Sequence, residues 1–428
     1  MAQGYDLVII GNGPAGNNAA EAARLAAPDL SILMISRETQ MEYSAPALPD
    51  YLADVIDLEG LTVNHLEHYE EYGIDLRLGD EVRKVDPGTK TITMASGEQI
   101  CYHKLIFATG SFPIRLRQMK GTELPGNFML KTLDDVEAIK AYPAKRAVVV
   151  GSGAIGLEGG MALKERGYEA VTIVEALDWI NKRSFDQKTA ERVVKALNDL
   201  GVEVLSGEAV EGVLGDEKVT GVKTTKRTIP CDLIIWGIGV RPEVTLAKET
   251  GVELGELGGI KVDGWMRTSI PNIYACGDCT ESTDQFTGKP ALNLFWEPAA
   301  RGGMAAGTNA AGGDREFAGS FALFLTYIGD VPVVAVGKTG QDLEGQEYLL
   351  LEEDRPDRFR RLYIQNGRLT GIQMVNTMED MDLLLDKLQK DNDAQAGPER
   401  ADWGEEEELS EEISAAGYLD LLKRRRRA

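Results

Sequence analysis

Hydrophobic and polar positions along this chain follow a strand–turn–helix pattern that occurs twice. An apolar run over Leu7–Ile10 leads through a glycine-rich turn to an alanine-rich helix predicted over Pro14–Ala26. The same order returns at the run Ala147–Val150, which leads to a helix predicted over Ile155–Arg166. Each pair is followed by another short apolar strand, and strands that alternate with helices indicate parallel sheets. We therefore expect two similar βαβ domains.

The two turns carry the spacing of a dinucleotide-binding motif. They read Gly11-Asn-Gly13-Pro14-Ala15-Gly16 and Gly151-Ser-Gly153-Ala154-Ile155-Gly156. In this motif the first glycine permits a tight turn, the second lets the backbone approach a pyrophosphate, and the third lets helix and strand pack closely. The helix N-terminus then offers free N–H groups to the phosphates. Two such turns predict two dinucleotides, with hydride transfer between them.

Other elements complete the expected architecture. A helix is predicted over Thr62–Tyr72, and an alanine- and glycine-rich helix over Ala299–Ala311. Beyond residue 316 the pattern changes to short strands. These are expected at Val333–Val336, Tyr348–Leu351, Arg361–Ile364 and Leu369–Met374. The expected fold class is α/β, with two Rossmann-like dinucleotide-binding domains and a small α+β C-terminal domain.

Composition excludes several classes of function. The chain has 428 residues and a net charge of −23, a surface that repels nucleic acid and anionic membranes. It contains no apolar stretch of about 18 residues, so we expect no membrane span. The first residues, Met1–Asp6, lack the basic and apolar parts of a signal peptide, and four cysteines do not make a disulfide framework. The cytoplasm is the expected compartment.

Cysteine and histidine give weak signals. Cys276 and Cys279 have the C-x-x-C spacing of a redox dithiol, but they lie inside a glycine–aspartate motif with another role. His65 and His68 are three residues apart on a polar helix face, and two ligands do not make a metal site. We expect no working dithiol and no metal.

Further motifs extend the pattern to a known family. Ala108-Thr109-Gly110 ends a strand of the first domain, and Ala275-Cys276-Gly277-Asp278 comes much later. Together with the two glycine turns, in this order, they resemble the pyridine nucleotide–disulfide oxidoreductase superfamily of flavoproteins. The resemblance covers about residues 5–378. It implies that the first turn binds FAD and the second binds NAD(H).

The resemblance implies five segments. The FAD domain would comprise residues 1–112 and 245–315, an NAD(H) domain would comprise 113–244, an interface domain 316–385, and a charged tail 386–428. The implied FAD contacts are Gly11, Gly13, Pro14, Ala15, Gly16, Ser36, Arg37, Glu38, Pro46, Ala108, Thr109, Gly110, Gly277, Asp278, Glu297, Pro298 and Ala299. The implied NAD(H) contacts are Gly151, Gly153, Ala154, Ile155, Gly156, Glu158, Glu175 and Gly239.

Individual positions add chemistry. Glu175 ends the second strand of the NAD(H) domain, where a carboxylate accepts from the ribose hydroxyls and repels a 2′-phosphate. In the FAD domain either Ser36 or Glu38 can take the same role. Glu158 would lie near the nicotinamide, or be a helix-dipole acid in the first turn. Pro298 would start a helix whose N-terminus faces the flavin, or merely start a helix.

The segment Tyr43–Leu52 narrows the subgroup. It contains no cysteine, unlike the disulfide reductases, and resembles the Y-x-R-P-x-L segment of rubredoxin reductases, ferredoxin reductases and the nitrite reductase flavoprotein. Two positions depart from that pattern. Ala45 stands where the relatives carry an arginine, and Asp50 where some carry a lysine near the flavin.

Three functions follow from these features. The first is electron transfer between NAD(H) and an iron–sulfur protein through FAD, either alone or as the NAD-linking subunit of a larger 2-oxoacid oxidoreductase such as phenylglyoxylate dehydrogenase. The second is a stand-alone NADH oxidase. The third is a non-catalytic, flavin-bound structural or redox-sensing subunit. We expect a homo-oligomer or a hetero-complex.

The C-terminal tail has two interpretations. It is a solvated acidic linker ending in the basic run Arg424–Arg427, or a docking helix. The docking helix would carry an apolar stripe of Leu409, Ile413, Tyr418, Leu421 and Leu422.

Overall fold

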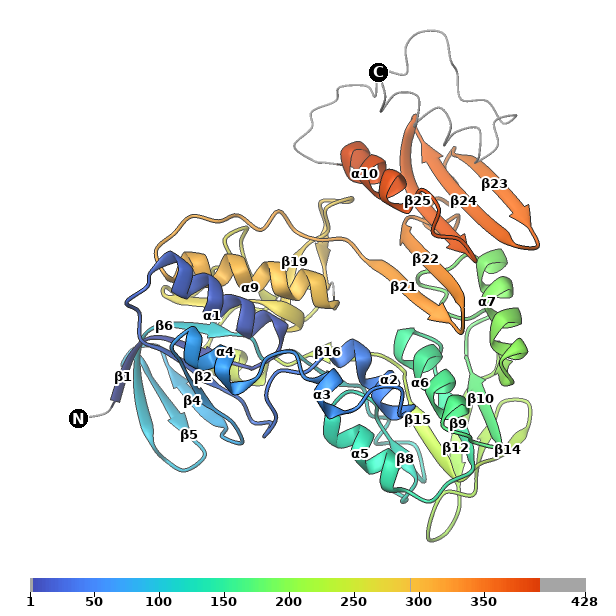
Figure 1. The fold of residues 1–428 in the computed structure, drawn as a ribbon, viewed down its shortest axis with the longest axis horizontal. Helices are drawn as coiled ribbons and strands as arrows, with labels where there is room; N and C mark the ends of the chain where they lie inside the picture. The colour runs from blue at the N-terminus through green and yellow to red at the C-terminus, as the bar shows by residue number, and fades with distance from the viewer. Residues whose placement is uncertain (1–2, 293, 393–428) are drawn as a thin grey trace. The chain divides into compact units, whose positions relative to one another are not determined.

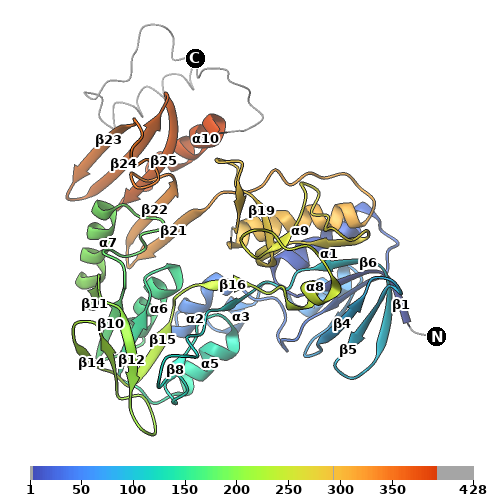
Figure 2. The same cartoon turned by 180° about the vertical axis from the view of Figure 1, so that it is seen from behind.

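The computed structural model describes residues 3–292 and 294–392 (Figures 1 and 2). The chain divides into two compact units, and each contains segments distant in sequence. Unit 1 comprises residues 1–47, 56–113 and 240–321, and unit 2 comprises residues 48–55, 114–239 and 322–428. The tail positions from 393 onward, including the proposed apolar stripe, lie outside the described residues.

Unit 1 is built on a parallel sheet with strand order β3-β2-β1-β6, and β18 adds in parallel beside β6. The antiparallel hairpin β4–β5 extends the sheet from β6. The strands are β1 (Gln3–Ile10), β2 (Ile32–Ile35), β3 (Ile74–Arg77), β4 (Val82–Asp86), β5 (Thr91–Met94), β6 (Gln99–Phe107) and β18 (Ile273–Ala275). Alternating residues of β1 point to opposite faces, which are both buried.

Two helices, α1 (Pro14–Ala26) and α9 (Trp296–Ala310), pack together in the core that contains Leu7 and Ile9 of β1. They approach so closely that a Cβ atom at Gly303 would lie 2.2 Å from the Ala15 carbonyl oxygen. Helix α8 (Thr245–Thr250) and the β4–β5 hairpin contribute to the core of the opposite face. Glycine on α9 therefore sets the distance between the two helices.

Shorter elements surround this sheet. They are η1 (Ala45–Ala47), α3 (Leu58–Leu61), α4 (Leu66–Glu71), β7 (Ser111–Pro113), β16 (Val240–Pro242), β17 (Ile260–Lys261), η2 (Gly277–Cys279), β19 (Thr280–Thr283) and β20 (Pro290–Ala291). The continuous helix predicted over Thr62–Tyr72 is wrong. Thr62 has extended backbone and ends α3, and α4 begins only after His65.

Unit 2 repeats the parallel plan with strand order β11-β10-β9-β15-β8. Its strands are β8 (Asn127–Phe128), β9 (Arg146–Val150), β10 (Ala170–Val174), β11 (Val202–Leu205) and β15 (Leu233–Trp236), with a small antiparallel sheet of β12 (Val210–Leu214), β13 (Gly221–Thr224) and β14 (Thr228–Pro230). Its helices are α2 (Leu48–Leu52), α5 (Leu133–Ala141), α6 (Ala154–Glu165) and α7 (Gln187–Asp199). The α/β fold class predicted from the sequence is confirmed.

An antiparallel sheet with order β21-β22-β25-β24-β23 belongs to the same unit. Its strands are β21 (Leu323–Ile328), β22 (Val331–Gly337), β23 (Leu349–Arg355), β24 (Arg358–Gln365) and β25 (Arg368–Val375), and α10 (Met381–Asn392) packs on β25. Neither strand β21 nor helix α10 was predicted from the sequence. The predicted domain ranges stay a prediction. The boundary predicted between residues 385 and 386 falls within α10.

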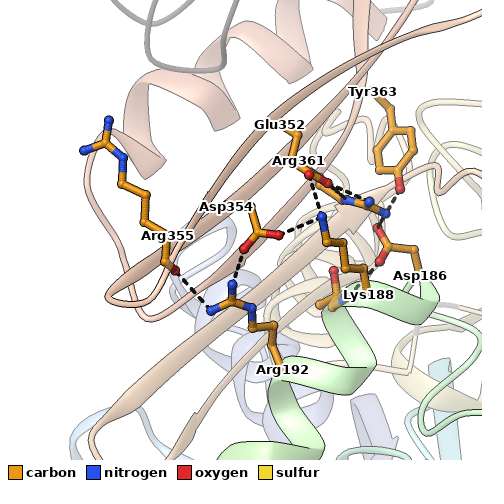
Figure 3. Close-up of polar contacts among 9 residues, drawn as sticks. Asp186, Lys188, Arg192, Glu352, Asp354, Arg355, Arg361 and Tyr363 are labelled. Atoms are coloured by element: carbon orange, nitrogen blue, oxygen red, sulfur yellow. Dashed lines mark hydrogen bonds and ion pairs between the residues drawn. The ribbon is translucent and has the colours of Figure 1, made fainter.

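Charged side chains join this sheet to α7 (Figure 3). Lys188 Nζ lies 2.6 Å from Glu352 Oε1 and 2.7 Å from Asp354 Oδ2, and Arg192 also pairs with Asp354. The N-cap residue Asp186 accepts a hydrogen bond of 2.6 Å from Tyr363. A network of several partly buried charges fixes geometry better than isolated surface pairs do. The C-terminal sheet is thereby held on α7.

No helix in the described part of the chain is long and apolar enough to cross a membrane.

Candidate functional site

The first glycine turn has the geometry that its sequence predicts. The backbone at Gly11 has φ of 124°, and a Cβ atom there would lie 2.0 Å from the Ala108 carbonyl oxygen. A Cβ atom at Gly16 would lie 2.1 Å from the Gly11 carbonyl oxygen. In contrast, apart from the adjoining residues of the chain, no atom lies within 4 Å of the position of a Cβ at Gly13, which is the N-cap of α1. The turn is tight on its protein side and open where a pyrophosphate would approach.

The later motif of unit 1 meets this turn. Gly277 has φ of 77°, and a Cβ atom there would lie 2.7 Å from the Ala15 side chain on α1. The next residue, Asp278, is partly buried and accepts a hydrogen bond of 2.7 Å from the Ser111 hydroxyl. Thr109 donates 2.6 Å to the Glu243 carbonyl oxygen. The structure thus brings together the three motifs that the sequence assigns to FAD.

The N-terminus of helix α9 lies beside the Gly277 motif. A small pocket there is lined by Gly277, Pro298 and Ala299, among others. The prediction that Pro298 is the first residue of this helix is wrong. The helix begins at Trp296, so Pro298 is its third residue. Proline is tolerated there because the first-turn N–H groups have no intrahelical acceptor. Glu297 is exposed and pairs with Arg301 at 3.2 Å.

The end of β2 offers two candidate ribose ligands. Ser36 is buried, and its hydroxyl accepts a hydrogen bond of 3.2 Å from the Glu38 N–H. The Glu38 carboxylate accepts 2.8 Å from the Tyr43 hydroxyl. Arg37 and Pro46 are exposed. Both alternatives for the ribose contact therefore stay open.

The second glycine turn repeats the first. A Cβ atom at Gly151 would lie 2.5 Å from the Gly237 carbonyl oxygen, and one at Gly156 would lie 2.0 Å from the Gly151 carbonyl oxygen. Apart from the adjoining residues of the chain, no atom lies within 4 Å of a Cβ at Gly153, which precedes Ala154 and Ile155 at the start of α6. Gly239, with φ of 109°, follows the neighbouring strand β15. Both turns therefore fit a dinucleotide.

Glu175 lies beside this turn. One of its carboxylate oxygens accepts a hydrogen bond of 3.2 Å from the Ser152 N–H and another from the Ser152 hydroxyl. The other oxygen accepts 2.9 Å from the Leu177 N–H. The cation nearest in sequence, Lys182, lies 4.0 Å above the Trp179 ring and pairs with Asp178 at 3.2 Å. The carboxylate is thus held at the end of β10 by two donors of the turn and by the Leu177 N–H.

Glu158 differs from its predicted position. Helix α6 begins at Ala154, so Glu158 lies in the second turn, where the helix dipole is weaker than in the first. Its carboxylate accepts a hydrogen bond of 2.9 Å from the Thr326 hydroxyl on β21. Burial, and to a smaller extent the negative charge of Asp50, raises the pKa of Glu158 to about 7, while the hydrogen bond from Thr326 opposes this rise. The dipole does not explain this acid, and its environment marks it as a candidate functional group.

All four cysteines are free thiols, and three of them are buried. Cys276 and Cys279 have no exposed surface, and burial raises the pKa of both thiols. The Cys279 thiol lies 3.2 Å from the Cys276 carbonyl oxygen. A reactive cysteine requires an accessible thiolate, and this pair has neither property.

One buried acid escaped the sequence analysis. Glu42 is 3% exposed, and its carboxylate accepts 2.6 Å from the Asn64 side chain. Burial raises the pKa of Glu42 to about 8, with a further contribution from the Glu21 charge. Its N–H donates to the Tyr69 hydroxyl, which in turn donates 2.9 Å to Asn12 in the first glycine turn. No local pattern signals this burial, because its neighbours come from three segments.

Comparison with known proteins settles the family. A family model described as pyridine nucleotide-disulphide oxidoreductase matches residues 5–307. The chain belongs to this family. It is an FAD-dependent NAD(P)H oxidoreductase that binds FAD and NAD(H), which confirms both predicted cofactors and argues against a non-catalytic subunit.

Three relatives illustrate the range of this family. The chain is 34% identical over 378 residues to an NADH oxidase of Methanocaldococcus jannaschii, covering 86% of this chain and 84% of the relative. It is 35% identical over 288 residues to the ferredoxin reductase subunit of 5,5′-dehydrodivanillate O-demethylase of Sphingobium sp., covering 66% and 69%. The solved NAD-dependent persulfide reductase from A. fulgidus matches with a TM-score of 0.84 and 29% identity, covering 90% and 76%. These relatives are named an oxidase, a ferredoxin reductase subunit and a persulfide reductase, so their names do not agree on one electron acceptor.

Proposed function

We propose that this enzyme passes electrons from NADH through FAD to an iron–sulfur protein that is a separate polypeptide chain. FAD supplies the conversion between a two-electron donor and a one-electron acceptor. The observation that carries the proposal is that neither the segment after β2 nor the C-x-x-C pair offers an accessible thiol for electrons to enter. The segment Tyr43–Leu52 has no cysteine, and Cys276 and Cys279 are sealed in the core. The relative in Sphingobium, named a ferredoxin reductase subunit, supports the same class of acceptor.

The residues of unit 1 would hold FAD in defined ways. The open turn at Gly13 and the N-terminus of α1 would bind the pyrophosphate, since helix N-terminal N–H groups favour anions. Asp278, held by Ser111, would accept from a hydroxyl of the ribityl chain. The N-terminus of α9 at Pro298 would stabilise negative charge on the flavin ring. In unit 2, Glu158 would contact the nicotinamide.

The overall charge constrains the partner. At −23, this chain repels an acidic iron–sulfur protein, so the partner would present a local positive patch. One form of the proposal is a subunit of a 2-oxoacid oxidoreductase complex such as phenylglyoxylate dehydrogenase. Co-purification of the native complex from its own cells would test that form.

A cytoplasmic location is part of the proposal, and the four free thiols agree with it.

The second candidate is NADH oxidase activity, which the 34% identity to the Methanocaldococcus jannaschii protein favours.

We expect anaerobic NADH to bleach the yellow holoenzyme, and an iron–sulfur acceptor to restore the colour severalfold faster than oxygen does. Stopped-flow absorbance with ferredoxin, rubredoxin and air-saturated buffer as separate acceptors measures this. If oxygen turns over as fast as every iron–sulfur acceptor, the oxidase function replaces ours. The variant Cys276→Ala with Cys279→Ala controls for a thiol route, and should retain NADH reduction of FAD.

Glu175 should set the preference for NADH over NADPH. In the Glu175→Ala variant, loss of charged hydrogen bonds to the ribose should lower kcat/KM for NADH by roughly 10- to 100-fold. NADPH should lose less or gain, because the repulsion of its 2′-phosphate disappears. Glu169→Ala, at the opposite end of β10, removes the same charge and should leave the ratio unchanged. Equal kcat/KM values for the two cofactors in the wild type would contradict the assignment.

A further inference from the structure

Three elements of unit 2 meet at one carboxyl group. Glu158 comes from α6, its hydrogen-bond donor Thr326 comes from β21, and the charge that acts on it, Asp50, comes from α2. Thr326 is buried, Glu158 is partly buried, and Asp50 is exposed. The result is a pair of acids with one hydroxyl donor, and within residues 3–292 and 294–392 no cation forms an ion pair with either acid.

Helix α2 is fixed beside α6, so Asp50 is held in this position. Arg166, the C-cap of α6, donates 3.1 Å to the Leu52 carbonyl oxygen and also pairs with Asp54. Lys140 of α5 donates 3.2 Å to the Tyr51 carbonyl oxygen and lies 2.6 Å from Asp54. Two cations thus fix the C-terminal end of α2, and the charge of Asp50 in its first turn acts on Glu158.

Strand β21 is fixed as well. It pairs with β22 along its whole length, and Phe324 packs edge-on against Phe185 at a ring-centroid distance of 5.0 Å. The sheet is held on α7 by the charge network of Figure 3. Thr326 therefore keeps its hydroxyl on Glu158 without a cost for ordering the strand.

The remaining neighbours of α6 bring no charge to this site. Strands β10 and β15 contain no ionisable side chain, Glu203 of β11 is occupied by the Thr172 hydroxyl at 2.9 Å, and Arg146 of β9 pairs with Asp232. Tyr327 of β21 points outward and is 54% exposed. Among the described charged groups, Asp50 is the one that acts on Glu158.

We propose that Glu158, set by Asp50 and Thr326, makes this enzyme distinguish oxidised from reduced nicotinamide in a pH-dependent way. The oxidised ring carries a positive charge and the reduced ring carries none. An ionised Glu158 attracts the oxidised ring, and a protonated Glu158 does not. NAD⁺ should therefore bind more tightly as the pH rises, with release of one proton, and the reduced form should not. This inference rests on the proposed nicotinamide contact of Glu158.

The test measures binding without turnover. Isothermal titration calorimetry of the oxidised holoenzyme at pH 5.5, 7 and 8.5 would use NAD⁺ and the redox-inert 1,4,5,6-tetrahydro-NAD, whose ring is neutral. The Kd for NAD⁺ should fall roughly tenfold across this range, because an opposite charge within about 4–6 Å shifts a carboxyl pKa by one unit or more. The Kd for the neutral analogue should stay constant. Buffers of different ionisation enthalpy should reveal proton release with NAD⁺ alone.

Three variants make the assignment specific. Glu158→Gln should abolish the pH dependence. Asp50→Asn removes the charge that opposes ionisation, so the midpoint should move to lower pH. Thr326→Val removes the donor that favours ionisation, so the midpoint should move to higher pH, and Thr326→Ser should restore it. A merely structural role would not move the midpoint in opposite directions.

The outcomes separate this inference from the proposed function. If Glu158→Gln keeps the wild-type pH dependence, or if neither neighbour moves the midpoint, the inference is wrong while NADH reduction of FAD can stand. If the holoenzyme binds neither nicotinamide form, the proposed function itself fails.

Discussion

Replacing Asp278 with alanine should weaken FAD binding by roughly 10- to 150-fold. Asp278 follows Gly277, whose left-handed backbone places it beside the first glycine turn, and Ser111 holds its carboxylate from the protein side. The variant loses a charge-assisted hydrogen bond to the cofactor, a class that contributes about 1.5–3 kcal/mol. The ratio of visible to ultraviolet absorbance of the purified protein, and titration of the apoprotein with FAD, measure the effect.

Two controls test the cause of that loss. Glu249→Ala removes one exposed negative charge from α8 of the same unit and should leave FAD affinity unchanged. Asp278→Asn keeps the shape and one acceptor oxygen, so its affinity should fall between those of the wild type and the alanine variant. An unchanged Kd in Asp278→Ala would show that this carboxylate makes no contact with FAD.

Replacing Glu42 with glutamine should stabilise unit 1 by about 4 kcal/mol at pH 8 and by less than about 1 kcal/mol at pH 5. The pKa of Glu42 is raised to about 8, whereas the unfolded chain ionises near the ordinary value of 4.5. Between these values the native state binds more protons than the unfolded state, so stability falls as the pH rises. Glutamine cannot ionise, so the variant escapes this cost.

The urea concentration at which bound FAD is lost, measured at pH 5 and pH 8, reports the stability of unit 1. Glu21→Gln is the matched control, since it removes only a secondary cause of the raised pKa of Glu42 and should give a much smaller gain. A gain in Glu42→Gln that is equal at both pH values would come from packing and would contradict the ionisation argument.

Local sequence was sufficient to predict the two glycine turns. Helix α1 begins at Pro14 as expected, because three glycines at fixed spacing and a proline in the first turn act within one strand–helix connection. The break at Thr62 was missed because the polar pattern there continues through both short helices. The start of α9 was misplaced by taking Pro298 as its first residue, although the first turn accepts proline at several positions.

The environment of the acids could not be predicted, because it is made by distant segments. The pKa of Glu158 depends on Thr326, which is 168 positions away, and on Asp50 of helix α2. The sequence-based domain ranges place α2 in the FAD domain, whereas the structure places it in unit 2. Glu42 is buried among side chains of three segments, none of which marks it by pattern. Amphipathic spacing reports which face of an element is buried, and it carries no information about what covers that face.

The division of unit 1 into three stretches of sequence sets the order in which the chain can fold during synthesis. Strand β6 pairs with β18 along one edge. The parallel sheet therefore stays incomplete during synthesis until Ile273–Ala275 have left the ribosome. The small-residue face of α1 waits still longer, for α9. Residues 114–239 of unit 2 emerge in this interval. Contacts across such separations form slowly, so the nascent chain exposes this apolar surface until α9 has been made.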